Sequence, residues 1–122
     1  MKSKPGDIKV QPRFRILRGK DIALGPGKAD LLEQVEKTGS IVGAAGNLGM
    51  SYMRAWTLIK TMEHCFTEPL VTMLRGGAEH GGAKLTPSGT RVVKLYRKLE
   101  AETLTATASA RKKLLMLLRD YP

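Results

Sequence analysis

The spacing of apolar residues changes several times along the chain, and each change marks a separate structural element. Apolar and polar residues first alternate between residues 9 and 17, which predicts an extended strand with one apolar face. The apolar positions of this strand are Val10, Pro12, Phe14 and Ile16. Pro12 has no amide hydrogen, so the strand is expected at the edge of a sheet. After a turn-like stretch at residues 18–21, Ile22 and Leu24 are placed to pair back with it.

Two helices are predicted next, because the apolar spacing shifts to three and four residues. The sequence "GPG" at residues 25–27 breaks the chain before a helix that runs to about Thr38. Ser40 is expected to cap a shorter second helix after the "TGS" interruption at residues 38–40. The apolar stripes are Leu31, Leu32 and Val35 in the first helix and Ile41, Ala44, Ala45 and Leu48 in the second.

A third helix is predicted to begin at Ser51, because Gly49 permits a turn and the Ser51 hydroxyl can accept hydrogen bonds from free amides. At about 100° per residue, its apolar face consists of Tyr52, Ala55, Trp56, Ile59, Met62 and Phe66. The opposite face carries Met53, Arg54, Thr57 and Thr61, flanked by Lys60 and His64. We therefore expect Trp56 to anchor the helix on the core and the polar face to be accessible. Pro69 is expected to end this segment.

Two strands and one long helix complete the predicted elements. Residues 70–75 and 83–86 are typical of strands joined by a glycine-rich loop at residues 76–82, the arrangement of a β-wing. From Pro87, with Thr86 as its cap, an apolar stripe keeps helical spacing to the end of the chain. A helix of roughly thirty residues would be about 45–50 Å long, which exceeds the width of the small domain that it leaves.

This order of elements is that of a winged helix-turn-helix. The predicted fold class is mainly α with a small β component, in one structural domain. Residues 1–86 would form a winged helix-turn-helix DNA-binding domain with an N-terminal strand, and residues 87–122 would form a long C-terminal helix for dimerisation. In such a fold the second helix of the motif enters the major groove, and residues near its amino end contact base edges.

Composition and charge favour a polyanionic partner. A chain of 122 residues with 42% apolar residues can bury one ordinary core, which leaves little room for an elaborate enzyme. The formal net charge of +10 favours nucleic acid or an acidic membrane surface. The chain has no long apolar run, so we expect neither a signal peptide nor a membrane span. The solitary Cys65 fits a reducing compartment, and we expect a cytoplasmic, nucleoid-associated protein.

The expected DNA contacts lie on the third helix and on the wing. Arg54 is on the first turn, where bases and phosphates can be reached, and Tyr52 can offer its hydroxyl to a phosphate. Wing residues suit backbone or minor-groove contacts. The expected DNA-binding residues are Ser51, Tyr52, Met53, Arg54, Thr57, Lys60, Thr61, Arg75, His80 and Lys84. Arg13 and Arg15 are expected on a solvated outer face, where their charge adds to the field.

The last helix is expected to form a dimer seam. Its far end extends beyond the domain, and "LLMLL" at residues 114–118 is apolar on all sides, so it needs a cover. The same helix of a second subunit is the expected cover, since two-fold dimers are the commonest oligomers. The alternative is a helix that folds back onto its own domain. The expected dimerisation residues are Val92, Leu95, Tyr96, Leu99, Ala106, Ala110, Leu114 and Leu117.

No combination of residues indicates catalysis, a metal or a cofactor. The glycine-rich segment 76–82 lacks the spacing of a phosphate-binding loop and joins two strands. His64 and Cys65 are adjacent, so on a helix their side chains diverge by about 100° and cannot form a base and nucleophile pair. His80 has no thiol or carboxylate cluster at metal-ligand spacing. We expect neither an enzyme nor a cofactor.

Four stretches together resemble one family of regulators. They are "TGSIVGAAGNLGMSYMRAW", "EPLVTMLRGG", "HGGAKLT" and "PSGTRVVKLYRKLE". Over residues 10–118 the chain resembles the amino-terminal DNA-binding domain of the ModE family of molybdate-responsive transcriptional regulators, which is related to the LysR-type helix-turn-helix. The resemblance implies a bacterial homodimer that binds double-stranded DNA. Many relatives carry two basic residues where this chain has Met53 and Arg54, so a different operator preference is expected.

The same resemblance limits the expected ligands. Full-length family members resemble this chain only in their first half and bind oxyanion through separate carboxy-terminal domains. No molybdate binding is therefore expected from this chain alone.

A second function stays open on the sequence alone. A winged helix can serve as a protein-interaction or assembly module, here with nonspecific affinity for nucleic acid. A docking face should show aromatic or aliphatic anchors, and Met53 and Leu58 supply some. The polar groups around Arg54 favour groove reading instead.

Overall fold

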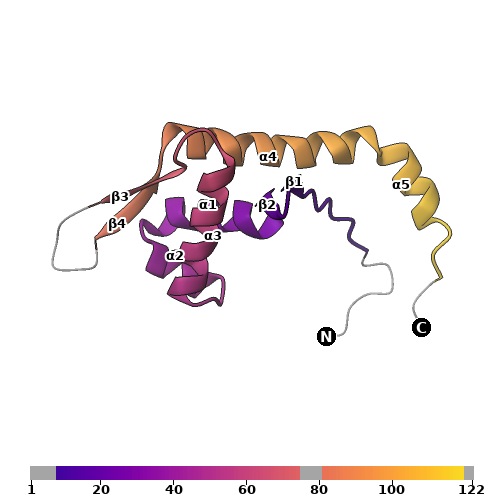
Figure 1. The fold of residues 1–122 in the computed structure, drawn as a ribbon. Helices are drawn as coiled ribbons and strands as arrows, with labels where there is room; N and C mark the ends of the chain where they lie inside the picture. The colour runs from indigo at the N-terminus through magenta and orange to yellow at the C-terminus, as the bar shows by residue number, and fades with distance from the viewer. Residues whose placement is uncertain (1–7, 75–80, 120–122) are drawn as a thin grey trace, which may run out of the picture.

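The computed structural model describes residues 8–74 and 81–119. Five helices and two separate two-stranded antiparallel sheets lie in this part of the chain (Figure 1). The elements are β1 (Ile16–Arg18), β2 (Asp21–Leu24), α1 (Pro26–Thr38), α2 (Ile41–Asn47), α3 (Tyr52–Cys65), β3 (Val71–Leu74), β4 (Gly82–Leu85), α4 (Pro87–Ala106) and α5 (Ala108–Leu115). The predicted fold class, mainly α with a small β component and a wing, is confirmed.

The core lies where α1, α2 and α3 meet, and α4 and the wing cover it. The predicted stripe of α1 is fully buried, as are the small residues of α2 that let the helices approach closely. Strand β4 and helix α4 both contact α1. The buried residues that form this core include Leu31, Leu32, Val35, Ala44, Ala45, Ile59, Met62, Leu70, Ala83, Val93 and Tyr96.

Hydroxyl side chains cap three helices at the predicted positions. The Ser40 hydroxyl accepts a hydrogen bond from the amide of Gly43 (2.9 Å), and the Ser51 hydroxyl accepts one from Arg54 (3.1 Å). The Thr86 hydroxyl accepts one from Gly89 (3.0 Å) at the start of α4. Each cap satisfies an amide that the helix itself cannot pair, a contribution of about 1 kcal/mol.

Gly49 makes the predicted turn between α2 and α3. Its φ is 68°, in the left-handed region that side-chain-bearing residues rarely adopt. This turn, together with the Ser51 cap, sets where α3 starts and hence which residues form its first turn.

The N-terminal strand is shorter than the alternation predicts. Pairing begins only at Ile16, which lies opposite Leu24, and residues 8–15 belong to no strand. The carbonyl of Phe14 instead accepts a hydrogen bond from the Tyr96 hydroxyl of α4 (2.8 Å). The alternation of residues 9–17 therefore reflects contact with a helix, because half-buried Phe14 packs against the core rather than in a sheet.

The predicted single long helix is also wrong, because it breaks at Thr107. Helix α4 ends at Ala106, and α5 turns away from its axis (Figure 1). The hydroxyl of Thr107 bonds the carbonyl of Thr103 (2.6 Å), and the Arg111 guanidinium bonds the Thr107 hydroxyl and the carbonyl of Leu104. Threonine hydroxyls compete for backbone groups in this way, and they bend or end helices.

The predicted dimerisation residues are consequently distributed over two helices, α4 and α5, and the turn that follows α5. One of these residues, Tyr96, is buried within its own subunit. Tyr96 is 2% exposed and belongs to the core, so it cannot lie on an exposed seam. Val92, another predicted dimerisation residue, is half-buried and packs against the core. Its neighbour Val93 is fully buried.

An ion cluster fastens α4 to α1. The Arg97 guanidinium donates to both carboxylate oxygens of Glu33 (3.0 and 2.7 Å) and to Asp30 (2.6 Å) and Glu100 (3.1 Å). The hydrogen bonds from Arg97 outweigh partial burial and hold the pKa of Glu33 below 4.5. The cluster fixes the angle at which α4 leaves the domain.

We expect Gly89→Ala to destabilise the fold. An added Cβ would lie 2.1 Å from the carbonyl oxygen of Leu70, a backbone atom that cannot move aside. Overpacking of this kind costs about 1–3 kcal/mol, measurable as a shift of the urea unfolding midpoint. Gly46→Ala in α2 is the matched control, because an added Cβ meets no atom within 4 Å and should stabilise the helix slightly. Equal stability of the two variants would contradict the expected clash.

Candidate nucleic-acid interface

Helix α3 turns one face to the core and the opposite face to solvent. Ala55, Ile59 and Met62 are between 0% and 3% exposed and fix the inner face. The predicted outer face is confirmed as accessible: Met53, Arg54, Thr57, Lys60 and His64 are exposed, and Thr61 is half-buried. This face is predominantly polar, as direct reading of base edges requires.

Trp56 does not lie in the core as predicted. Its side chain is 37% exposed, and the ammonium group of Lys60 lies 4.9 Å from the ring centroid. Helical spacing places Trp56 at the margin of the apolar face, and no other element covers that margin completely. Tyr52, one turn earlier on the same side, is 42% exposed. The two rings therefore form an aromatic margin on the side of α3 that faces the wing.

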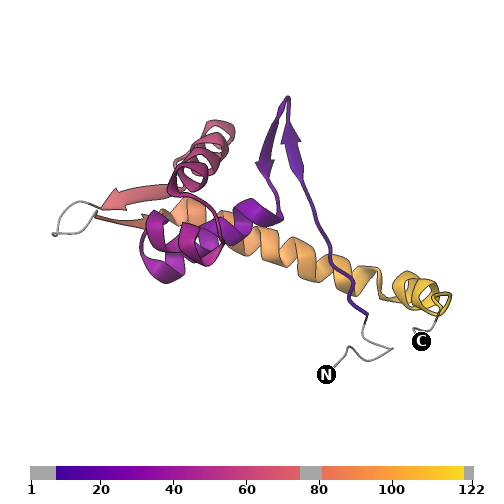
Figure 2. The same ribbon diagram turned by 90° about the horizontal axis from the view of Figure 1, so that it is seen from below.

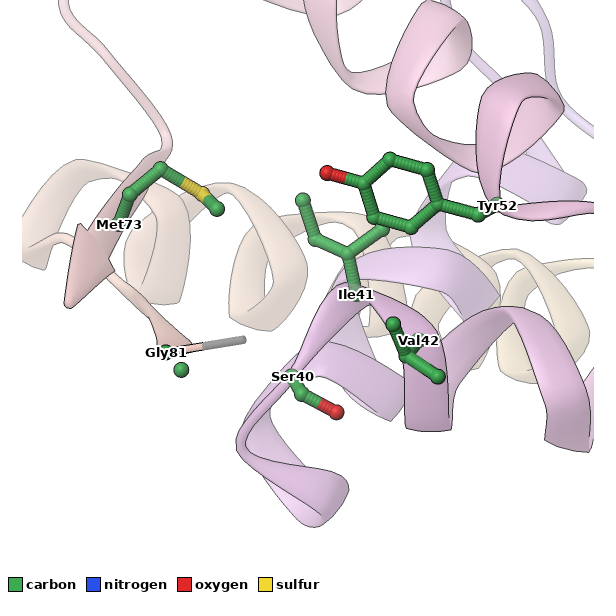
Figure 3. Close-up of a pocket in the computed structure, with 7 residues that line it drawn as sticks. Ser40, Ile41, Val42, Tyr52, Met73 and Gly81 are labelled. Atoms are coloured by element: carbon green, nitrogen blue, oxygen red, sulfur yellow. The ribbon is translucent and has the colours of Figure 1, made fainter. Parts of the chain in front are cut away.

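A hollow of about 390 Å³ lies between Tyr52 and the wing (Figure 3). Tyr52 from α3 and Met73 from β3 point toward each other across it, and Ile41 of α2 forms its floor (Figure 3). Ser40, Val42, Gly81 and Gly82 complete the lining. The amino ends of α2 and α3 and the loop ends of the wing strands thus meet around one depression.

Lys28 of α1 lies within electrostatic range of Arg54, which the sequence did not indicate. Partial burial is the largest cause that lowers the pKa of Lys28 from 10.5, and the positive charge of Arg54 lowers it further. Lys28 belongs to α1 and is 26 positions away in the chain, so only folding brings the two cations together. Periodicity within one helix carries no signal for such a pair.

The wing is tied to α3 by a carboxylate. Oε2 of Glu63 accepts hydrogen bonds from the backbone amides of Leu70 (2.9 Å) and Val71 (3.0 Å), where β3 begins. Lys60 lies 3.7 Å from the other carboxylate oxygen, although it is well exposed to solvent. Glu63 therefore orients the wing relative to the outer face of α3.

Only part of the predicted wing contact can be located. Lys84 is exposed on β4, where it lies opposite Thr72 of β3. Arg75 and His80, the other predicted wing contacts, lie outside the described residues.

The structure weakens the case for a protein-docking face on α3. Leu58 is half-buried and packs against the core, so it is not available as an anchor. Met53 is 64% exposed, but its neighbours Arg54 and Thr57 are polar. Exposed Tyr52 and Trp56 lie near Met53 on α3, so apolar anchors remain only along one margin of an otherwise polar face.

Within residues 8–74 and 81–119, His, Cys, Asp and Glu form no group of three that could hold a metal ion. None of the helices in these ranges has the length and apolar character needed to cross a membrane.

Solved structures define the class of the fold. The LysR-type regulator LysG of Corynebacterium glutamicum is 26% identical, covers 73% of this chain and 29% of its own, and has a TM-score of 0.53. The DNA-binding domain of CbnR, solved as a DNA complex, is 18% identical, with a TM-score of 0.52 over 72% of this chain and 93% of its own. The structure is accordingly a winged helix-turn-helix of the LysR-type kind.

Proteins of similar sequence indicate more specifically which regulators the chain is related to. The molybdenum transport protein ModE of Azotobacter vinelandii is 44% identical over 84 residues, 69% of this chain and 31% of that protein. The molybdenum-pterin-binding protein MopB of Rhodobacter capsulatus is 34% identical over 109 residues, 89% of this chain and 40% of that protein. The DNA-binding transcriptional dual regulator ModE of Escherichia coli K12 is 38% identical over 71 residues, 58% of this chain and 27% of that protein.

The chain is a homologue of these ModE and MopB proteins and fits an amino-terminal ModE-like winged-helix domain, as the sequence motifs suggested. It spans less than half of the length of the relatives it matches. No family model matches the sequence.

We expect Glu63→Ala to loosen the wing. The variant leaves the amides of Leu70 and Val71 without their acceptor, at a cost of about 1–3 kcal/mol for an unsatisfied buried donor. Hydrogen exchange at these two amides should accelerate relative to the amides of α1. His64→Ala, an exposed neighbour on the same helix, should leave both stability and exchange unchanged. Protection of the two amides in Glu63→Ala equal to that of the wild type would refute the role of this carboxylate.

Proposed function

We propose that the protein is a sequence-specific regulator that binds double-stranded DNA as a homodimer through the outer face of α3. The observation that carries the proposal is this face itself: exposed, polar, and held by a core that fixes its rotation. An α-helix fits the major groove, where each base pair presents a distinct pattern of donors and acceptors. The CbnR domain, which has the same fold, was solved as a DNA complex, which supports DNA as the partner.

The predicted contacts divide by their position on α3 and the wing. Arg54, on the first turn, suits a bidentate contact with a guanine edge, and Thr57 is one turn further along the exposed face. Tyr52 and Ser51 lie at the amino end of the helix, where hydroxyl groups reach phosphates. Met53 suits an apolar contact with a thymine methyl group. Lys60, Thr61 and Lys84 complete the described set of proposed contacts.

We infer that the dimer forms through the exposed apolar residues of α4 and α5. Leu95 and Leu99 on α4 are 56% and 39% exposed, and Leu114 and Leu117 near α5 are 65% and 82% exposed. Monomers do not usually leave so many large apolar side chains in water along two consecutive helices. Ala106 and Ala110, also exposed, lie on either side of the break at Thr107.

The remaining proposals concern ligands and place of action. Because the relatives named as regulators act on transcription, we place the protein on chromosomal DNA in the cytoplasm. We assign it no catalytic activity, no cofactor and no molybdate site. A protein-interaction module is the second candidate, and the exposed Met53, Tyr52 and Trp56 favour it.

We expect Arg54→Ala to weaken binding to a duplex from the promoter of the protein's own operon by about 1–3 kcal/mol. The loss should be small on a scrambled duplex, because a base contact adds affinity only at the matching sequence. Gel-shift titration at several salt concentrations measures the affinity of the variant for each of the two duplexes. Arg91→Ala is the matched control, an exposed arginine on α4 that removes the same charge. A uniform loss on both duplexes would assign Arg54 to phosphate, and equal wild-type affinity for both duplexes would remove the specific regulator.

We expect Leu114→Asp to dissociate the dimer and weaken promoter binding with it. A carboxylate at this position would be buried without a partner in the proposed interface, which is strongly unfavourable. Sedimentation measures the mass of the particle. Ser109→Asp is the control, because it adds the same charge to α5 on a different face. A Leu114→Asp variant that keeps the wild-type mass would exclude α5 from the interface.

A further inference from the structure

The β1–β2 hairpin projects beside α3, on the side away from the wing. Figure 2 shows the hairpin and α3 extending to the same side of α4, with the wing beyond α3. Strand β2 contacts α3, where the buried Ala23 and Leu24 join the hairpin to the body of the domain. The face that α3 offers to a partner is therefore flanked by the hairpin on one side and the wing on the other.

The end of the hairpin is a tight, basic turn. Gly19, with φ of 59°, lies in the tight turn, and Arg18 and Asp21 are directly opposite each other in the strand register. Arg15, Arg18 and Lys20 are all exposed. No carboxylate of a described residue lies within salt-bridge distance of these three cations. Asp21 is the acidic residue of the hairpin, so the hairpin carries an excess of positive charge.

Lys28 of α1 adds one positive charge to the surroundings of the hairpin and α3. Lys28, at the start of α1, lies within the electrostatic reach of both Asp21 and Arg54. Arg13 is separate, because it lies with Asp30 and Glu100 near the Arg97 cluster, where neighbouring carboxylates offset its charge.

We propose that the β1–β2 hairpin is a second phosphate-binding arm, which holds the DNA backbone on the side of α3 opposite the wing. The inference rests on the proposed function and adds a surface that the sequence did not assign to DNA. Unpaired cations on a tight turn beside a groove-reading helix suit a phosphate backbone, because each contact releases a counterion and needs no base sequence. The hairpin also exposes two apolar side chains, Leu17 and Ile22, which could contact a second copy of this protein. Such a contact is less favourable than DNA binding, because two hairpins of like charge repel each other.

The salt dependence of binding tests the arm. The full-length double variant Arg18→Ala/Lys20→Ala is titrated with a random-sequence duplex at several salt concentrations by fluorescence anisotropy. Loss of two phosphate contacts should reduce the slope of log K against log salt by roughly 2 and weaken binding most at low salt. Lys94→Ala/Lys112→Ala is the matched control, since it removes two exposed cations from α4 and α5. Arg18→Lys/Lys20→Arg, which keeps both charges, should restore the wild-type slope.

Each other outcome overturns one specific statement. If the hairpin and control variants lose the same amount, the hairpin acts only through net charge and the arm is refuted. If Leu17→Asn dissociates the dimer while the double variant binds like its control, the hairpin is an assembly element instead. If the wild-type protein itself fails to bind any duplex, the proposed function fails, and this result is distinct from a failure of the arm.

Discussion

The burial of Ala55, Ile59 and Met62 is the constraint on which the rest of the structure depends. These side chains fix the rotation of α3 about its axis, and that rotation decides which residues meet a partner. Burying a large apolar side chain such as Ile59 or Met62 contributes about 1.5–3 kcal/mol. Turning the helix by one position would expose them and force polar groups such as Arg54 toward the core, which costs still more.

The position of α3 is supported from two sides by different kinds of interaction. On the wing side the Glu63 carboxylate holds the two amides where β3 begins, so the wing follows the helix. On the opposite side β2 packs its buried residues against the helix. Apolar packing and charge-assisted hydrogen bonds are both short-ranged, and together they present α3 as part of a preorganised surface. The outer face can then meet a partner without first being ordered.

The distribution of exposed apolar groups separates two surfaces. Tyr52 and Trp56 form an aromatic margin beside the polar face of α3, whereas Leu95 and Leu114 lie on the helices that leave the domain. The break at Thr107 changes the geometry of the second surface, because α5 no longer continues the line of α4. A partner subunit would have to follow two helix directions rather than one straight seam.

The sequence by itself determined the first three helices, the serine and threonine caps, the turn at Gly49 and the burial of Ala55, Ile59 and Met62 on α3. These features depend on residues a few positions apart, so local periodicity and hydrogen bonding encode them. The exposure of Trp56, the approach of Lys28 to Arg54, the late start of β1 and the burial of Tyr96 were decided only by the tertiary structure. Whether a side chain is covered, paired or left in water depends on neighbours that are distant in the chain, and a local pattern holds no information about them.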